Sequence, residues 1–212
     1  MPPVILRLLK SSLDLLAPAR CAGCGRHGDE LCGSCAVSIT AKTSIERFSD
    51  VRIVALGAYE GIVRRAIHAL KYGNRPGLGS TLGKILANRI LSTLGDGQRT
   101  IVVPVPLHLT RLRERGYNQA ELIARAFADL HEPGALVRAR ATAAQAQLDR
   151  LDRERNVAGA FATGSRAARV VGKNVLIVDD VVTTGATVRA CAGVLRAAGA
   201  TSVMAAAIAL RL

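Results

Sequence analysis

Residues 175–187, VLIVDDVVTTGAT, contain a run of apolar residues, two adjacent carboxylates and a turn rich in threonine and glycine. The apolar run is typical of a buried strand, and residues 185–199 have the amphipathic pattern of a helix that ends at glycine. A further apolar strand is expected over residues 202–210. A strand, a helix and a strand in this order predict a βαβ unit, whose two strands lie parallel in one sheet.

The alternation of strands and helices extends upstream of this unit. Further strands are expected over residues 51–59, 100–107 and, more weakly, 135–139. Further helices are expected over residues 62–73, 82–95 and 117–131. The apolar runs are continuous, which is typical of parallel strands buried on both faces. We therefore predict an α/β fold with a parallel sheet and helices on both sides.

The turn after the two carboxylates has the composition of an anion site. Ligands of parallel sheets bind outside the carboxyl ends of the strands, where this turn is expected. Thr183, Thr184 and Thr187 offer hydroxyl groups, and Gly185 lets the backbone approach a ligand closely. The free N–H groups of a helix that starts near Ala186 would point at the same ligand.

The carboxylates Asp179 and Asp180 suit a different part of that ligand. An ionised carboxylate only accepts hydrogen bonds, and a pair of neighbouring sugar hydroxyls supplies the donors. A phosphorylated ribose would offer hydroxyl groups to the two carboxylates and a phosphate group to the turn. The alternative, a capped helix with Thr184 or Thr187 at its start and a solvated Asp180, accounts for one acidic residue and one threonine only.

Four of the five cysteines form two C-x2-C pairs within CAGCGRHGDELCGSC, at Cys21, Cys24, Cys32 and Cys35. Each pair can direct two thiolates at one ion, and four thiolates form a closed, structural zinc site. Two disulfides or a metal-free knuckle are the alternatives, although a reducing cytosol disfavours disulfides. His27 is expected to be solvated, and Cys191 is expected in the core.

The composition favours anionic partners. The chain has 29 Lys and Arg against 16 Asp and Glu, a formal net charge of +13, which suits nucleic acid. Translation of a GC-rich genome, with its abundant Arg and Ala, explains this charge about equally well. Aromatic residues make up only 3% of the chain, so stacking platforms for single strands are scarce.

The N-terminal 20 residues do not fit a signal peptide, because Arg7, Lys10 and Asp14 interrupt them and no small-residue cleavage site follows. One helical stripe, expected to pack on the body, consists of Leu6, Leu9, Leu13 and Leu16. No segment reaches the roughly 18 apolar residues of a membrane helix. We expect a cytoplasmic protein without an integral membrane segment.

Two other segments have no clear chemical signature. The stretch GLGSTLGKI, residues 77–85, has three rather than four residues between Gly79 and Gly83 and follows no strand, so we expect a loop that enters a helix. Residues 139–160 are polar and lack an apolar stripe, which favours a functional loop or a solvated insertion.

The motifs together resemble the ComF family of competence-related proteins, and VLIVDDVVTTGAT is similar to the phosphoribosyl pyrophosphate signature of type I phosphoribosyltransferases. Besides the cysteine pairs, the shared features are HALKYG, PVPLHLTRLRERGYNQ, Gln145-x2-Leu148, Arg153-x2-Asn156 and GAF. The resemblance implies a Rossmann-like phosphoribosyltransferase domain over residues 49–212. Residues 1–48 would form an N-terminal helix and a zinc knuckle.

The resemblance also implies roles for particular residues. Asp179 and Asp180 would bind the ribose hydroxyls, with Mg2+ held mainly through the substrate. The 5′-phosphate would be bound by Val182, Thr183, Thr184, Gly185, Ala186 and Thr187. Pyrophosphate would be bound by Pro106, Leu107, His108, Arg111 and Arg115, with Arg113 beside them. A flexible hood would carry Gln145, Arg153 and Asn156.

The implied function is the binding of phosphoribosyl pyrophosphate and a role in DNA uptake, with single-stranded DNA and the uptake machinery as partners. One alternative is a true phosphoribosyltransferase with an unidentified acceptor; the other is a zinc-stapled accessory protein that binds single-stranded DNA without turnover. No pattern indicates a purine or pyrimidine pocket. Lys71 could help to neutralise pyrophosphate, or it could be a solvated lysine at a helix end.

Overall fold

The computed structural model describes residues 19–40, 43–48, 50–91, 100–140, 157 and 159–211. The predicted N-terminal helix and its leucine stripe lie outside these residues, as do the hood candidates Gln145, Arg153 and Asn156. Within the described part of the chain, no helix combines the length and the apolar character that crossing a membrane requires.

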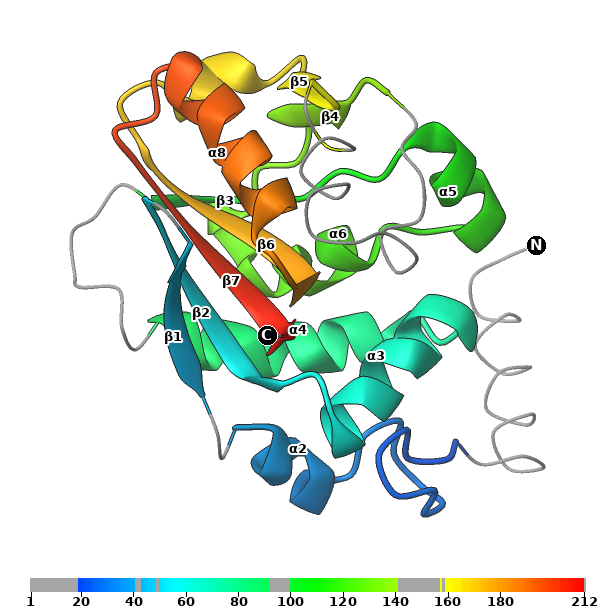
Figure 1. Cartoon of the computed structure of the whole chain (residues 1–212). Helices are drawn as coiled ribbons and strands as arrows, with labels where there is room; N and C mark the ends of the chain where they lie inside the picture. Colours follow the sequence, from blue (N-terminus) through cyan, green and yellow to red (C-terminus); the bar gives the residue numbers. More distant parts are fainter. Residues whose placement is uncertain are drawn as a thin grey trace.

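A five-stranded sheet with the order β1-β2-β7-β6-β3 lies at the centre of the molecule (Figure 1). The strands are β1 (Ser44–Phe48), β2 (Val51–Ala58), β3 (Thr100–Pro104), β6 (Asn174–Val182) and β7 (Ser202–Leu210). Four of them are parallel, which confirms the predicted sheet, and β1 pairs antiparallel with β2 at the edge. Edge strand β1 was not predicted, because its sequence SIERF has only two apolar residues, which form neither an apolar run nor an alternating pattern.

Helices cover both faces of the sheet (Figure 1). One face packs against α2 (Gly33–Thr40), α3 (Gly61–Tyr72), α4 (Gly77–Leu91), α6 (Gln119–Ala124) and the 3-10 helix η1 (Arg125–Leu130). The other face packs against α8 (Ala186–Ala197), the short 3-10 helix η3 (Ala167–Val170) and a small antiparallel sheet of β4 (Leu136–Arg138) and β5 (Phe161–Thr163).

The continuous apolar runs of the strands follow from this double cover. In β6, Leu176 and Val178 join the core beneath α3 and α4, whereas Val175 and Ile177 join the core beneath α8. Successive side chains of a strand point to opposite faces, so consecutive residues are buried in the middle of a doubly covered strand, as in residues 175–178 of β6.

The glycine-rich stretch at residues 77–85 is the start of a helix, not the predicted loop. Two of its glycines, Gly79 and Gly83, allow close packing of α4 against α6, since a Cβ atom on Gly79 would lie 2.5 Å from Leu122 Cβ. A Cβ atom on Gly83 would meet the carbonyl oxygen of Ile123. Packing of two helices therefore explains the glycines without a ligand.

Helix boundaries elsewhere also differ from the sequence expectation. The helix predicted over residues 117–131 divides into α6 and η1, and Ala128 interrupts η1 with a positive φ. Helix α5 (Leu109–Arg115) was not predicted, and it buries none of its side chains. An exposed helix of this kind lacks the apolar periodicity by which helices are recognised.

The cysteine-rich segment packs on the same core as the sheet. Cys21, Leu31 and Ile39 belong to the buried cluster that includes Leu56 and Leu70. Strand β1 starts at Ser44, only a few residues after the end of α2 at Thr40, and it pairs with β2 in the central sheet. The segment that connects the cysteine knuckle to the sheet is therefore short. The division of the chain after residue 48 stays a prediction.

Candidate functional site

The two carboxylates lie where the sequence placed them, near the carboxyl end of β6. The side chain of Asp180 is buried and its Oδ1 atom lies 2.9 Å from Nζ of Lys71. Lys71 comes from the last turn of α3 and is itself mostly covered. The structure thus brings Lys71 into the site and shows that it is not a solvated lysine.

The end of α3 is held in place beside Asp180 by Tyr117. Its hydroxyl group donates a hydrogen bond of 2.5 Å to the carbonyl of Leu70. Burial alone would lower the pKa of Lys71, but the carboxylate of Asp180 outweighs it and raises that pKa. The ion pair with Asp180 therefore favours the charged form of Lys71.

Asp179 lies in a different electrostatic environment. Its Oδ1 atom accepts a hydrogen bond of 2.8 Å from the backbone N–H of Asp180. Burial and the neighbouring charge of Asp180 raise the pKa of Asp179 to about 7, against the opposing effects of Lys71 and Arg138. Arg138, at the end of β4, stacks over the ring of Phe161 at 5.4 Å.

The contribution of Asp179 to the stability of the unliganded protein should fall as the pH rises from about 4 to about 7. Over this range folded Asp179 keeps a proton that the unfolded chain releases, because its pKa rises from 3.8 to about 7 on folding. Asp179→Asn should remove this slope and stabilise the fold at about pH 8 by up to a few kcal/mol. Thermal unfolding at about pH 5 and pH 8 tests this, and equal wild-type and variant slopes would contradict it.

The turn after β6 forms a small concavity at the amino end of α8, lined by Asp179, Val182, Thr183, Gly185, Ala186 and Thr187. Gly185 has a φ of 71°, and a Cβ atom there would lie 2.8 Å from Cβ of Phe48 in β1. Both the left-handed backbone and this close approach therefore require glycine.

Thr184 makes hydrogen bonds to the first turn of α8. Its Oγ1 atom accepts a hydrogen bond of 3.4 Å from the N–H of Ala186, and its carbonyl accepts one of 2.8 Å from Arg189. The capped-helix alternative is wrong, because Gly185 rather than a threonine is the N-cap residue of α8 and Asp180 is buried, not solvated. Helix capping does not account for Asp179 and its neighbours.

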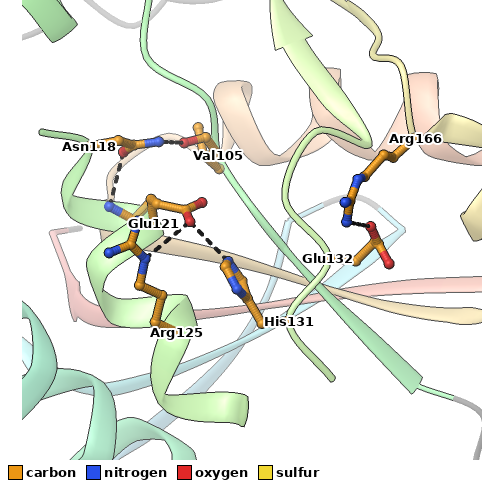
Figure 2. A network of polar contacts seen from close by, with 8 residues as sticks. Val105, Asn118, Glu121, Arg125, His131, Glu132 and Arg166 are labelled. Atoms are coloured by element: carbon orange, nitrogen blue, oxygen red, sulfur yellow. Dashed lines mark hydrogen bonds and ion pairs between the residues drawn. The ribbon is translucent and has the colours of Figure 1, made fainter. Parts of the chain in front are cut away.

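The loop after β3 lies at the same edge of the sheet. The backbone N–H of Val105 donates to the carbonyl of Val178 at 2.9 Å, and Asn118 Nδ2 donates to the carbonyl of Val105 at 2.9 Å (Figure 2). Asn118 also caps α6 by accepting from the N–H of Ala120. The motif GYNQ therefore holds both flanking segments, α3 through Tyr117 and this loop through Asn118.

The residues predicted for pyrophosphate follow in this loop and in α5. His108 accepts a hydrogen bond from the N–H of Thr110 and caps α5. Arg111 pairs with Glu114 at 3.2 Å, and Arg115 lies over the ring of Tyr72 at 5.4 Å. Arg111 also lies close enough to lower the pKa of Arg138, although burial of Arg138 contributes more.

Sequence reasoning missed Arg138 and left Lys71 undecided. HALKYG was a signal for Lys71, since this motif is shared within the ComF resemblance. Arg138 had no signal, because a lone arginine at the end of a weak strand is usually a surface residue. Only the packing of the β4–β5 sheet brings it near Asp179.

The four clustered cysteines converge as predicted. One Sγ atom from each of Cys21, Cys24, Cys32 and Cys35 lies within 4.8 Å of the others. Tetrahedral zinc with Zn–S distances of about 2.3 Å places sulfur atoms about 3.8 Å apart, and Sγ atoms of Cys24 and Cys32 are 3.7 Å apart. The cluster therefore fits a closed zinc site, and a Cβ atom on Gly23 would come within 2.7 Å of Cys35 Sγ.

The thiols of this cluster differ in acidity. Burial opposes ionisation of Cys21, but the backbone N–H groups of Cys32, Cys24 and Gly23 lower its pKa to about 6. Burial and the neighbouring thiols raise the pKa of Cys35 to about 12. His27 is exposed outside the cluster, and Cys191 is fully buried in the core as predicted.

Comparison with known proteins places the chain in a family. The family model described as "Phosphoribosyl transferase domain" matches residues 76–212. The chain belongs to this phosphoribosyl transferase family. It is 36% identical over 159 residues to "DNA utilization protein YhgH" of Escherichia coli K12, covering 72% of this chain and 69% of that protein. It is 29% identical over 193 residues to "Competence protein F" of Haemophilus influenzae, covering 83% and 79%. The predicted membership of the ComF family is confirmed.

Solved phosphoribosyl transferases are more distant. A hypoxanthine phosphoribosyltransferase of Staphylococcus aureus is 14% identical with a TM-score of 0.34, and the match covers 64% of this chain and 62% of that one. A Trypanosoma cruzi hypoxanthine phosphoribosyltransferase is 18% identical with a TM-score of 0.38, over 62% and 67%. The match therefore spans less than two thirds of the Staphylococcus aureus enzyme.

Proposed function

We propose that this phosphoribosyl transferase domain binds phosphoribosyl pyrophosphate, with Mg2+, at the carboxyl end of β6. The observation that carries the proposal is the position of Asp179 and Asp180 directly before the concave turn at the amino end of α8. Carboxylates accept from ribose hydroxyls, and the turn with its helix N-terminus suits the 5′-phosphate. The ribose hydroxyls and the 5′-phosphate of one ligand would therefore contact complementary groups that lie a few residues apart in the sequence.

The turn before α8 would bind the 5′-phosphate of the ligand, and the loop after β3 would bind its pyrophosphate. The 5′-phosphate is assigned to Val182, Thr183, Thr184, Gly185, Ala186 and Thr187. Pyrophosphate is assigned to Pro106, Leu107, His108, Arg111 and Arg115. Support for the second assignment comes from the bond between Val105 and β6, which keeps this loop at the same edge of the sheet. Gln145, Arg153 and Asn156 remain candidates for a hood.

Mg2+ fits the chemistry of the site but not as an all-protein cage. Hard carboxylate oxygens are the ligands that Mg2+ prefers, and it usually keeps substrate phosphates and water in its shell. Asp180 already pairs with Lys71, which leaves Asp179 as the less committed carboxylate. Mg2+ held mainly by pyrophosphate would neutralise the charge of that group.

Phosphoribosyl pyrophosphate with Mg2+ should raise the melting temperature of the full chain, by about 2–4 °C per kcal/mol of binding free energy. The shift should weaken below about pH 7, where Asp179 takes up a proton and can no longer act as a pure acceptor. Differential scanning fluorimetry with and without Mg2+ measures both effects. A wild-type protein that shows no shift at about pH 8 would refute the site assignment.

A role in DNA uptake is our second proposal, and a cytoplasmic location agrees with it. It is supported by the names of the relatives and by a groove between α3 and the cysteine module. This groove is lined by Arg64, Arg65, His68 and Arg75. Arg65 and Arg75 donate hydrogen bonds to the carbonyls of Gly23 and Glu30, so they also fasten the module.

Single-stranded DNA should bind this protein with an affinity that falls steeply as the salt concentration rises. Each phosphate contact contributes about −0.7 to the slope of log affinity against log salt, so Arg64→Gln should reduce that slope by about 0.7. Fluorescence anisotropy with a labelled oligonucleotide at several salt concentrations measures the slope. Absence of binding at low salt would refute the DNA proposal and leave the phosphoribosyl pyrophosphate proposal intact.

A further inference from the structure

The solvent-facing side of α3 carries a row of basic and aromatic side chains. Arg64, His68 and Tyr72 follow one another at intervals of four residues, which places them on one face of the helix, and all three are exposed. The side chains that α3 buries in the core are a different set, namely Val63, Ala66, Ile67 and Leu70. Packing against the sheet therefore does not explain the row.

The first half of this row lines the groove beside the cysteine module. The groove has a volume of about 550 Å³, and its polar side chains are Arg64, Arg65, His68 and Arg75. In the described part of the chain, no Asp or Glu belongs to this lining. Arg65 and Arg75 each donate a hydrogen bond to a carbonyl of the module, which fixes two of the charges in position. Clustered positive charge without a counter-charge attracts anionic ligands.

The row ends at an exposed aromatic ring. The chain has three Tyr, three Phe and no Trp, all six rings lie in the described part of the chain, and only that of Tyr72 is exposed, at 66%. The ring centroid of His68 lies 4.8 Å from that of Tyr72, and the guanidinium of Arg115 lies over the Tyr72 ring at 5.4 Å. Unpaired bases stack on aromatic rings and on guanidinium planes, so this end of the row suits a base.

Tyr72 also lies at the edge of the proposed ribose-phosphate site. The residue before it, Lys71, forms the ion pair with Asp180, and Arg115 is the last residue of α5 and belongs to the residues assigned to pyrophosphate. Tyr117 fixes this end of α3 through its hydrogen bond to the carbonyl two residues before Tyr72. A ligand that follows the row from the groove would therefore end beside the pyrophosphate position.

We propose that Arg64, His68 and Tyr72, with Arg115 at the far end, form a track for single-stranded DNA. Unpaired bases stack on Tyr72, and the phosphates contact the arginines. This inference deepens the DNA proposal above and rests on it. The helix rises by about 12 Å from Arg64 to Tyr72, which corresponds to about three or four nucleotides spaced 3.4 Å apart. Duplex DNA keeps its bases paired and cannot offer them to Tyr72.

Substitution of Tyr72 tests the stacking. Tyr72→Ala should weaken binding of a labelled oligothymidine strand at least about fivefold, whereas Tyr72→Phe keeps the ring and should bind like the wild type. Neither variant should change the salt slope, since stacking neutralises no phosphate. A hairpin duplex should bind equally well to wild type and Tyr72→Ala. Fluorescence anisotropy measures all of these affinities.

Two results would overturn the track while DNA binding itself stands. One is a Tyr72→Ala protein that binds the single strand normally, and the other is an equal loss of affinity for single strand and duplex. If the wild type binds no single strand at low salt, the DNA proposal and the track fall together.

Substitution of Arg115 tests where the track ends. Arg115→Gln should reduce the slope of log affinity against log salt by about 0.7, the contribution of one phosphate contact. Arg47→Gln, which removes an exposed arginine from edge strand β1, is the matched control and should leave the slope unchanged. An unchanged slope in Arg115→Gln would overturn the placement of this end.

The shared arginine also predicts coupling between the two ligands. At constant Mg2+ concentration, phosphoribosyl pyrophosphate should weaken oligothymidine binding about fivefold or more, because two anionic ligands compete for Arg115. Equal affinities with and without it, in a protein whose melting temperature it raises, would overturn the shared end. A protein without that thermal shift refutes the ribose-phosphate proposal instead, and the Tyr72 and Arg115 variants then decide on the track by themselves.

Discussion

Asp180→Asn is expected to abolish the thermal shift by phosphoribosyl pyrophosphate and to destabilise the unliganded protein. The variant keeps the shape of the side chain but leaves the covered ammonium of Lys71 without its ion-pair partner at 2.9 Å. Breaking a fully buried pair costs about 3–5 kcal/mol, and the remaining exposure of Lys71 reduces this to roughly 1–3 kcal/mol. Loss of a hydrogen bond to a charged group weakens binding by a further 1.5–3 kcal/mol or so.

The double variant Lys71→Met, Asp180→Asn separates the two effects. Removing both charges should recover most of the lost stability, because no uncompensated charge remains, while binding stays absent. Asp50→Asn is the matched control, since Asp50 pairs with Arg196 in an exposed position near the carboxyl end of α8. Urea unfolding and fluorimetry report stability and binding, and an Asp180→Asn protein that still shifts normally would exclude ribose recognition by this residue.

Removal of metal from the four-cysteine cluster is expected to unfold the cysteine module and to destabilise the core that it shares with the sheet. Three of the four ligands are buried in that core, so the thiols cannot be rehydrated without opening it. Structural zinc contributes about 10–16 kcal/mol of apparent binding free energy in isolated fingers. We expect about one zinc ion per chain and a fall in melting temperature of at least about 5 °C on chelation.

Cys35→Ser should lose the zinc as well, because serine is a poor zinc ligand at neutral pH. The control is Cys191→Ala, which removes a buried thiol from the opposite face of the sheet and should keep the zinc content unchanged. Elemental analysis and circular dichroism measure the two properties. A purified wild-type protein without zinc that is also insensitive to chelators would show that the thiols pack without a metal.

Much of the fold was accessible from local pattern. The continuous apolar runs predicted a parallel sheet, and β2, β3, β6 and β7 form it. The predictions failed where the local sequence pattern is ambiguous, as in the glycine-rich stretch, or absent, as in β1 and α5. Glycines in residues 77–85 serve helix packing, the polar edge strand β1 lacks an apolar run, and exposed α5 buries nothing.

The sequence by itself determined the groups whose members are neighbours along the chain. Asp179, Asp180 and the turn after them form one strand-to-helix connection, and the cysteines of each pair are three residues apart, so backbone geometry alone keeps their members close. The tertiary structure decided which distant groups face them. Lys71 reaches Asp180, Arg138 approaches Asp179 and β1 covers Gly185 because sheet order and helix packing bring these segments together, and no local periodicity encodes that order.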